Sequence, residues 1–406
     1  MYMKHAFEMP DPNKTLNFQS QRDCLFMSGE QCIVTQGIKS RFTSPINNTQ
    51  QLVETVQQQL TKQPEGTLAF GVLPFCKTQQ AHFIIPNKTT RWERPAISSW
   101  LKAELSTLNK KVNHIEAVTY LQNQAQFKSS VNAAKQLFSE TTLEKIVLSK
   151  QVDLTFKDPI NKELVLSQLL QQSRSGYHFS FPVNDHTTLM GVSPELLLAK
   201  HGPHVLSNPL AGSIPRAASA QQEAKHKKAL FNSHKDRFEH AVVIEDMEKV
   251  LTPFCNTLDV PLEPSLLSTA TMWHLSTELK GELQNQHTHI LDIANKLHPS
   301  PALCGKPTQA AYSHILDLEK HSRDLFSGII GWCDQHGNGE WVVVIRCAQL
   351  EKYQARLFAG AGIVSASEPT LEWQETDAKL KTMLNALGLT LQDIQQLSNP
   401  KENAEL

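Results

Sequence analysis

The chain has 406 residues, and its 39 Lys and Arg against 40 Asp and Glu give a formal net charge of −1 at pH 7. This balance excludes the basic footprint of nucleic-acid binders and the polybasic helix of membrane-surface proteins, so a small-molecule partner is favoured. The length allows two or three average domains or one large fold.

Cysteine usage and the apolar runs bear on where the protein works. Seven cysteines are scattered without a Cys-x-x-Cys pair, which indicates neither a disulfide framework nor a zinc site. A reducing cytoplasm fits this pattern best. The N-terminal stretch 1–15 meets Pro10 and Asp11 before an apolar run develops, and no later run approaches the about 18 apolar residues of a membrane span. We therefore expect neither an export signal nor a membrane segment.

Organisation changes near residue 126. Residues 1–125 are polar and rich in Gln, with apolar runs at 66–75 and 81–86 that predict strands. Apolar residues at helical spacing in 127–138 predict a helix that leads into a strand at 145–154. No linker separates these parts, so we expect a single domain over 1–406, with a motif-poor part at 1–125 and all motifs at 126–390.

Lys145 opens the predicted strand 145–154 on the same side as Val147. Desolvation there would favour the neutral amine that a lysine general base requires. The alternative is a solvated lysine guarding a sheet edge.

Glu195 follows a Ser193–Pro194 turn between two apolar strands, from where it can project into a cleft. A carboxyl group in partly apolar surroundings has a raised pKa and can act as an acid. The alternative is an ordinary charge at a strand end. Further on, Gly212 and Ser213 lie in a predicted turn where a backbone amide can approach a ligand closely.

The predicted helix 236–251 aligns Glu239 with Val243 and Val250 on one stripe. A carboxylate that leans toward apolar neighbours is paired, protonated or bound to a metal, and two such glutamates from different helices would suit Mg²⁺. His274 and His298 have no partner at metal-ligand spacing, so we expect them to be structural or to line a cleft.

The later half contains a predicted antiparallel meander with strands at 325–332, 341–350 and 355–364. In its second strand, Arg346 continues the row of Val342 and Val344, and a buried guanidinium requires an anion. The alternative is that Arg346 ends the strand and its side chain reaches water.

A predicted helix at 369–387 follows a predicted glycine turn at 360–362. Glu372, Glu375 and Lys379 share one face of this helix at spacings of three and four residues. This stripe is either an ordinary salt bridge within the helix or a group of charges that meets a divalent cation or a substrate. The glycine pattern does not indicate a dinucleotide site, because no βαβ unit follows.

Ten segments in register resemble the chorismate-utilising enzymes over about residues 126–390, and among these the chain is most similar to isochorismate synthases that begin catechol siderophore synthesis. The segments are KIVLSK, SPELLL, PLAGSIPR, KDRFEH, TMWHLST, HPSPALCG, SGIIGWCD, GEWVVVIRCAQL, LFAGAGIV and LEWQETDAKL. The resemblance implies an α+β fold, a single large unit with layered antiparallel sheets, outer helices and a deep active-site cleft. It also implies chorismate as substrate, Mg²⁺ as cofactor and no glutamine amidotransferase subunit. The oligomeric state cannot be read from the sequence, and we expect a monomer.

The resemblance also implies residue roles. Lys145 would activate water for attack at ring carbon 2, and Glu195 would protonate the hydroxyl that leaves carbon 4. Glu239 and Glu375 would hold Mg²⁺, with Glu372 supporting the ion through water or a neighbouring ligand. The substrate-binding residues implied are Gly212, Ser213, His274, Ala302, Leu303, Phe326, Arg346, Gly360 and Lys379.

Three other functions remain open at this point. One is a salicylate synthase, which would also eliminate pyruvate, although HPSPALCG speaks against it. Another is an isochorismate synthase of the menaquinone pathway. The third is a catalytically silent homologue that only binds ligands, which the presence of all the implied catalytic residues disfavours.

Overall fold

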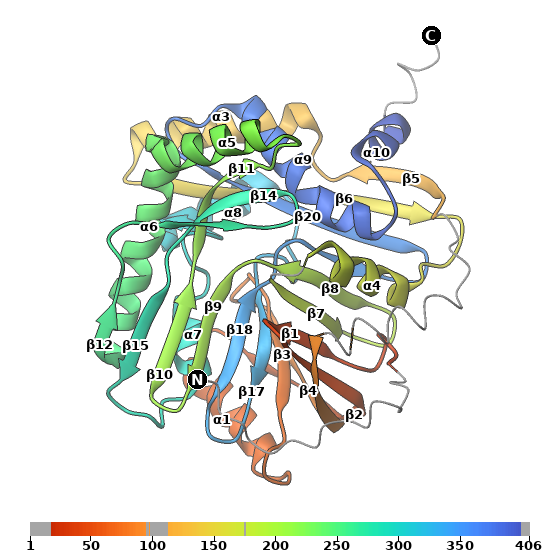
Figure 1. The fold of residues 1–406 in the computed structure, drawn as a ribbon, viewed down its shortest axis with the longest axis vertical. Helices are drawn as coiled ribbons and strands as arrows, with labels where there is room; N and C mark the ends of the chain where they lie inside the picture. The colour runs from red at the N-terminus through yellow and green to blue at the C-terminus, as the bar shows by residue number, and fades with distance from the viewer. Residues whose placement is uncertain (1–17, 95–96, 98–112, 174–175, 399–406) are drawn as a thin grey trace.

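A computed structural model describes residues 18–94, 97, 113–173 and 176–398 (Figure 1). The stretch 1–15, for which we expect no export signal, lies outside the described residues. In chain order the elements are β1 (Leu25–Ser28), β2 (Gln31–Pro45), α1 (Thr49–Leu60), β3 (Ala69–Leu73), β4 (Gln80–Glu93), β5 (Ile115–Tyr120), α3 (Gln124–Glu140), β6 (Lys145–Phe156), α4 (Lys162–Gln172), β7 (Tyr177–Pro182), β8 (Thr188–Ser193), β9 (Leu196–His201), β10 (His204–Asn208), β11 (Leu210–Pro215), α5 (Ala220–Asn232), α6 (His234–Leu251), the short 3-10 helix η1 (Thr252–Phe254), β12 (Cys255–Asp259), β13 (Ser265–Ser268), β14 (Met272–Ser276), β15 (Leu279–Leu283), α7 (Ile290–Leu297), β16 (Gly305–Lys306), α8 (Thr308–Glu319), β17 (Ile329–Cys333), β18 (Gly339–Val343), β19 (Cys347–Leu350), β20 (Gln354–Ile363), α9 (Pro369–Ala386) and α10 (Leu391–Ser398).

Among the described residues, seventeen strands form one continuous sheet, and a second sheet has three strands, β11, β14 and β13. Within the described ranges every strand pairing is antiparallel. From neighbour to neighbour the large sheet runs β12, β15, β10, β9, β18, β17, β3, β4, β2, β1, β7, β8, β19, β20 and β6, and both β5 and β16 pair with β6. The fold is therefore α+β.

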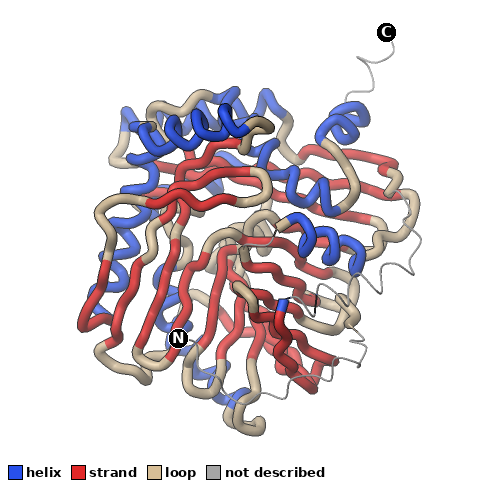
Figure 2. Tube along the Cα trace, in the orientation of Figure 1, coloured by secondary structure: helices blue, strands red, loops and turns tan. Residues whose placement is uncertain are grey.

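The large sheet folds over, so that the half from β12 to β4 faces the half from β2 to β6 (Figure 2). Phe26, Phe70 and Phe179 belong to the apolar core between these halves. Leu25 and Met27, which flank Phe26, point the other way into the core beneath α4, α9 and α10. Because both faces of these strands are buried, they read in the sequence as apolar runs without alternation.

Helices cover the outer faces of both halves (Figure 1). Helices α1, α6 and α7 pack on the half from β12 to β4, and α4, α9 and α10 pack on the other half. Helices α3 and α8 cover β6 and β20 at the far end. Among the described residues, no helix is both long enough and apolar enough to cross a membrane.

Several predicted elements are confirmed. The predicted strand at 145–154 is β6, and the helices predicted at 127–138, 236–251 and 369–387 are α3, α6 and α9. Pro369 occupies the first turn of α9, where its missing N–H costs no hydrogen bond.

Three local predictions are wrong. The segment predicted as one strand at 341–350 forms two strands. Strand β18 ends at Val343 and β19 begins at Cys347, and between them Arg346 has a φ of 51°. Gly360 and Gly362 lie inside β20 rather than in a turn. Gly212 and Ser213 also lie in a strand, β11, where the register shifts and Gly212 has a φ of 77°.

Two chain crossings between the halves meet at one place. The chain passes from β8 to β9 through Pro194 and Glu195, and from β18 to β19 through Val344 and Arg346. The crossings are hydrogen-bonded to each other's strands, because Val343 N donates to Glu195 O (3.2 Å) and Val192 N donates to Arg346 O (3.2 Å). This arrangement brings Glu195 and Arg346, which are far apart in sequence, to the same cleft.

Candidate active site

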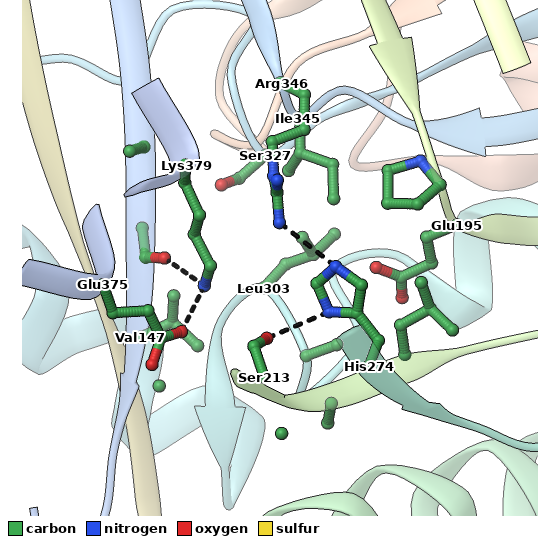
Figure 3. A pocket seen from close by; sticks show the side chains of 18 of the residues that line it. Val147, Glu195, Ser213, His274, Leu303, Ser327, Ile345, Arg346, Glu375 and Lys379 are labelled. Atoms are coloured by element: carbon green, nitrogen blue, oxygen red, sulfur yellow. Dashed lines mark hydrogen bonds and ion pairs between the residues drawn. The ribbon is translucent and has the colours of Figure 1, made fainter. Parts of the chain in front are cut away.

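A cleft of about 650 Å³, including solvent at its mouth, lies where the crossings meet the three-stranded sheet and helices α6 and α9 (Figure 3). It has the size and the mixed apolar and polar lining of a small-molecule site. All but two of the predicted site residues line it. The two exceptions are Lys145 and Glu372. The predicted residues that line the cleft are Glu195, Gly212, Ser213, Glu239, His274, Ala302, Leu303, Phe326, Arg346, Gly360, Glu375 and Lys379.

Glu195 is 3% exposed and faces the cleft from the crossing between β8 and β9. Burial raises the pKa of its carboxyl to about 7, although a hydrogen bond from the Leu210 backbone and the charges of Lys145, Lys379 and Arg346 act in the opposite direction. The carboxyl is therefore partly protonated near neutrality, as an acid catalyst requires. This direction is the one that the sequence predicts for Glu195.

Arg346 is buried rather than solvated, so the alternative that its side chain reaches water is wrong. Its Nη2 lies 3.3 Å from His274 Nε2, and His274 Nδ1 lies 2.9 Å from Ser213 Oγ (Figure 3). Burial and then the charges of Arg346 and Lys379 hold the pKa of His274 well below its usual value. Because a guanidinium can only donate, the neutral imidazole accepts at Nε2 and donates from Nδ1 to Ser213.

Within the described ranges, the guanidinium of Arg346 retains one unpartnered nitrogen, Nη1, for a ligand. Its Nη1 is buried and has no hydrogen-bond partner in the described part of the chain. Burial lowers the pKa of Arg346 to about 10, against the opposing charges of Glu375 and Glu195. A buried cation with an unused donor at a cleft wall is suited to binding a carboxylate. Arg346 also adopts a positive φ, a strain that is concentrated at functional sites.

Lys145 lies behind the cleft wall, fully buried at the start of β6. Its Nζ is 3.0 Å from Glu239 Oε1, and the alternative of a solvated edge lysine is therefore wrong. Burial opposes ionisation of Glu239, but the charges of Lys145 and Lys235 keep the pKa of this glutamate below its usual value. Gly362 makes room for this ion pair, because a Cβ at that position would lie 2.0 Å from Glu239 Oε1.

The remaining carboxylates stand on α9 and are also paired with lysines. Glu375 Oε1 lies 2.6 Å from Lys379 Nζ, which also donates to Gly360 O at 2.7 Å. Glu372 does not line the cleft, and it binds Lys235 of α6 at 2.7 Å. Burial and the charge of Glu375 raise the pKa of Glu372 to about 7, against the opposing effect of Lys235. The intrahelical salt bridge proposed as an alternative for this stripe thus exists between Glu375 and Lys379.

The donor set of the cleft fits a hard divalent cation. No group of three or more His, Cys, Asp or Glu side chains at metal-binding distance occurs in the described ranges. Mg²⁺ does not require one, since it is commonly held by one or two carboxylates together with waters and substrate oxygens. Glu239 and Glu375 line the same cleft from two helices and could act as these two carboxylates.

Sequence reasoning missed several residues of the site. Among them, Gly362 and Ser327 line the cleft, and Lys235 holds Glu372. Gly362 carries the clearest signal, because it alternates with Gly360 along one face of a strand and two small residues on one face leave room for a ligand or a side chain. Nothing in the local sequence of Ser327, whose φ is 60°, marks it.

Comparison with known proteins identifies the family to which this chain belongs. Residues 85–388 match the family model described as chorismate binding enzyme. The vibriobactin-specific isochorismate synthase of Vibrio cholerae is 37% identical over 377 residues, 91% of this chain and 92% of that protein. The isochorismate synthase EntC of Escherichia coli is 39% identical over 372 residues, 90% and 94% of the two chains.

A solved structure agrees with these relatives. The putative 2,3-dihydroxybenzoate-specific isochorismate synthase DhbC from Bacillus anthracis superposes with a TM-score of 0.84 at 36% identity, covering 92% of this chain and 98% of that one. The family match covers most of the chain and includes every residue that lines the cleft. The chain belongs to the chorismate binding enzyme family.

Proposed function

We propose that the protein is an isochorismate synthase, which isomerises chorismate by adding water at ring carbon 2 and releasing the hydroxyl from carbon 4. The observation that carries this proposal is that one cleft contains both a buried acid, Glu195, and a buried Arg346 with an unused donor. An acid is needed for the leaving hydroxyl, and a cation is needed for a substrate carboxylate. Relatives named isochorismate synthase support the same activity.

Lys145 and Glu195 would divide the proton transfers between them. To act as the base, Lys145 must be neutral although its Nζ lies 3.0 Å from the Glu239 carboxylate; the neutral Nζ would then accept a proton from the attacking water. A carboxyl oxygen of Glu195 would donate its proton to the departing hydroxyl oxygen, which is feasible near neutrality because the pKa of Glu195 is about 7. The net reaction adds and removes one water, so no redox partner is required.

The other cleft residues would bind and orient the substrate. Arg346 Nη1 would donate to a carboxylate, while the neutral His274 holds Nη2 of the same guanidinium. Lys379 would contribute a second positive charge, and Gly360 would let the substrate approach the backbone. Apolar walls from Ala302, Leu303 and Phe326, together with Gly212 and Ser213, would complete the pocket.

Glu239 and Glu375 would hold Mg²⁺, and Glu372 would support the ion from behind the cleft wall. The bound ion would supply positive charge opposite the ring carboxylate. Against the opposing effect of burial, the charges of Lys145 and Lys235 keep the pKa of Glu239 below its usual value, which favours the ionised carboxylate that a cation requires.

The names of the relatives and the composition of the chain support the proposed biological setting. The names vibriobactin-specific and 2,3-dihydroxybenzoate-specific favour a role in catechol siderophore synthesis. Seven free cysteines are consistent with the cytoplasm. We propose that the protein acts as a monomer without an amidotransferase subunit.

Product analysis tests the proposed activity. Purified protein is incubated with chorismate and Mg²⁺, and the products are separated by chromatography. Isochorismate is the expected product, and the Glu195→Gln variant should form little of it. Accumulation of salicylate and pyruvate would instead identify a salicylate synthase, and complete recovery of chorismate would contradict the proposal.

A further inference from the structure

One edge of strand β6 lacks a strand partner just beyond the proposed base. Along its other edge, β6 pairs with β20 from Ile146 to Thr155. On the edge away from β20, β16 pairs only with Lys145 and Ile146, and β5 begins to pair at Val152. Next to these strands, Val147 N donates to Cys304 O and Leu121 N donates to Gln151 O, so in the described part of the chain only the edge from Val147 O to Ser149 lacks a neighbouring backbone segment.

Two side chains fill this gap. Ser149 N donates to Glu319 Oε1 at 2.6 Å, and Arg323 Nη2 donates to Val147 O at 2.7 Å. Glu319 ends α8, and Arg323 follows four residues later. Together the carboxylate and the guanidinium present an acceptor and a donor to β6, which is the pattern that a neighbouring strand would present.

The Glu319–Arg323 pair is itself held firmly. Arg323 Nε lies 2.8 Å from Glu319 Oε2, and the two side chains are only 3% and 2% exposed. Arg323 Nη1 donates to Leu303 O at 2.9 Å, and the guanidinium lies 4.3 Å from the centroid of the Phe75 ring. A buried ion pair is costly unless its remaining hydrogen-bonding capacity is used, and here it is used on the backbone of two cleft residues.

We propose that Glu319 and Arg323 are positioning residues for the reaction. They fix the backbone of Val147 and Leu303, and through β6 they fix Lys145, relative to the cleft. The inference rests on the proposed function, because it assumes that Lys145 is the base and that its position determines the rate. Neither Glu319 nor Arg323 lines the cleft.

The expected effect is on turnover more than on substrate binding. A misplacement of about 1 Å in a reacting group can cost about 100-fold in rate. Lys145 lies two residues from Val147 on the same strand, whereas Arg346 and Lys379 lie on other elements. Loss of the pair should therefore lower kcat more than it raises the KM for chorismate, to which Leu303 contributes one wall of the cleft.

The first test is Arg323→Lys, which keeps the charge but cannot reach Val147, Leu303 and Glu319 together. We expect kcat to fall about tenfold or more, with KM within about threefold of wild type. The matched control is Arg356→Lys. Arg356 also binds a β6 carboxylate with two bonds, to Asp153 at 2.9 and 2.8 Å, but these side chains are 39% and 34% exposed and lie outside the cleft lining. The control variant Arg356→Lys should therefore keep the kcat of the wild-type protein.

Chemical rescue separates positioning from general destabilisation. In Arg323→Ala, added guanidinium ion at millimolar concentration should restore part of kcat, because it can occupy the vacated space and donate to the same carbonyls. The same addition should not change Arg356→Ala. A second variant, Glu319→Gln, should lower kcat in the same way, since it removes the charge that orients the guanidinium.

Hydrogen exchange in the wild-type protein provides a test that does not depend on variants. The amide of Ser149 should exchange as slowly as the amides that β6 pairs with β20. Fast exchange at Ser149 would overturn the inference, and so would wild-type kcat in folded Arg323→Lys and Glu319→Gln. An equal loss in Arg356→Lys would also overturn it. By contrast, a wild-type protein that makes no isochorismate would refute the proposed function.

Discussion

Glu195 provides the most direct prediction at the level of single residues. Burial raises the pKa of its carboxyl to about 7, and only the protonated form can donate to the leaving hydroxyl. The profile of kcat/KM against pH, which reports on the free enzyme, should therefore be level below about 7 on this limb and fall as pH rises through 7. Glu195→Gln should lower kcat/KM by about 100-fold or more.

Glu340 offers a matched control for this experiment. Burial raises its pKa to about 7 as well, but it hydrogen-bonds Ser28 on β1 and does not line the cleft. Glu340→Gln should therefore keep the alkaline limb of the profile. If Glu195→Gln retained this limb, another group would have to be the acid.

Gly362 provides a second prediction at this scale, because it leaves room for the Lys145–Glu239 ion pair. A Cβ at Gly362 would lie 2.0 Å from Glu239 Oε1, whereas a Cβ at Gly360 would meet its nearest neighbours at an ordinary 3.5 Å. Gly362→Ala should displace the Glu239 carboxylate from Lys145 and lower the free energy of unfolding by about 1–3 kcal/mol. Gly360→Ala, in the same strand, should have a smaller effect in the same denaturant titration. Equal effects of the two would show that Gly362 has no special relation to Glu239.

At the level of elements, α6 and α9 each contribute one carboxylate to the cleft. If Glu239 and Glu375 hold Mg²⁺ together, the ion links the two helices and stabilises the folded state by mass action. Adding Mg²⁺ at about 100 times its Kd should contribute about 2.7 kcal/mol to the free energy of unfolding, visible as a rise in Tm. Chelation should remove both this rise and turnover.

Variants of these two helices make the metal prediction specific. Glu239→Gln and Glu375→Gln should each abolish the Mg²⁺-dependent rise in Tm. Glu245→Gln on α6 is the control, since Glu245 is exposed and pairs with Lys306 outside the cleft. A full Mg²⁺ response in either of the first two variants would contradict the assigned ligands.

For the whole molecule, the sequence predicts elements whose signal is local. Helix α9 repeats its apolar residues at helical spacing, and its charged stripe of Glu372, Glu375 and Lys379 follows the same spacing. Both features lie within one segment of the chain, so the sequence predicts them. The strand β6, with Lys145 at its start, is similarly evident. The roles of these residues, however, came from the resemblance of ten segments and not from their periodicity.

Features that depend on how the sheet folds over could not be predicted. The apolar run through Val342, Val343 and Val344 predicts one strand, yet the chain leaves one half of the sheet at this point and enters the other. The break at Arg346 is therefore imposed by tertiary packing. The ion pair between Lys145 and Glu239 likewise joins a strand and a helix that are distant in sequence, and no local pattern marks it.

The same topology gives β1 to β4, in residues 25–93, a structural role, although residues 1–125 carry no motif. Strands β3, β4, β2 and β1 stand in the middle of the large sheet, where they join β17 of one half to β7 of the other. A chain that begins at residue 126 would leave the edges of β17 and β7 without partners and would open the core between the halves. We expect this shortened chain to aggregate or to lack the near-ultraviolet circular dichroism of a packed core, with no turnover of chorismate. A soluble, cooperatively melting and active shortened chain would show instead that residues 126–406 form an independent catalytic unit.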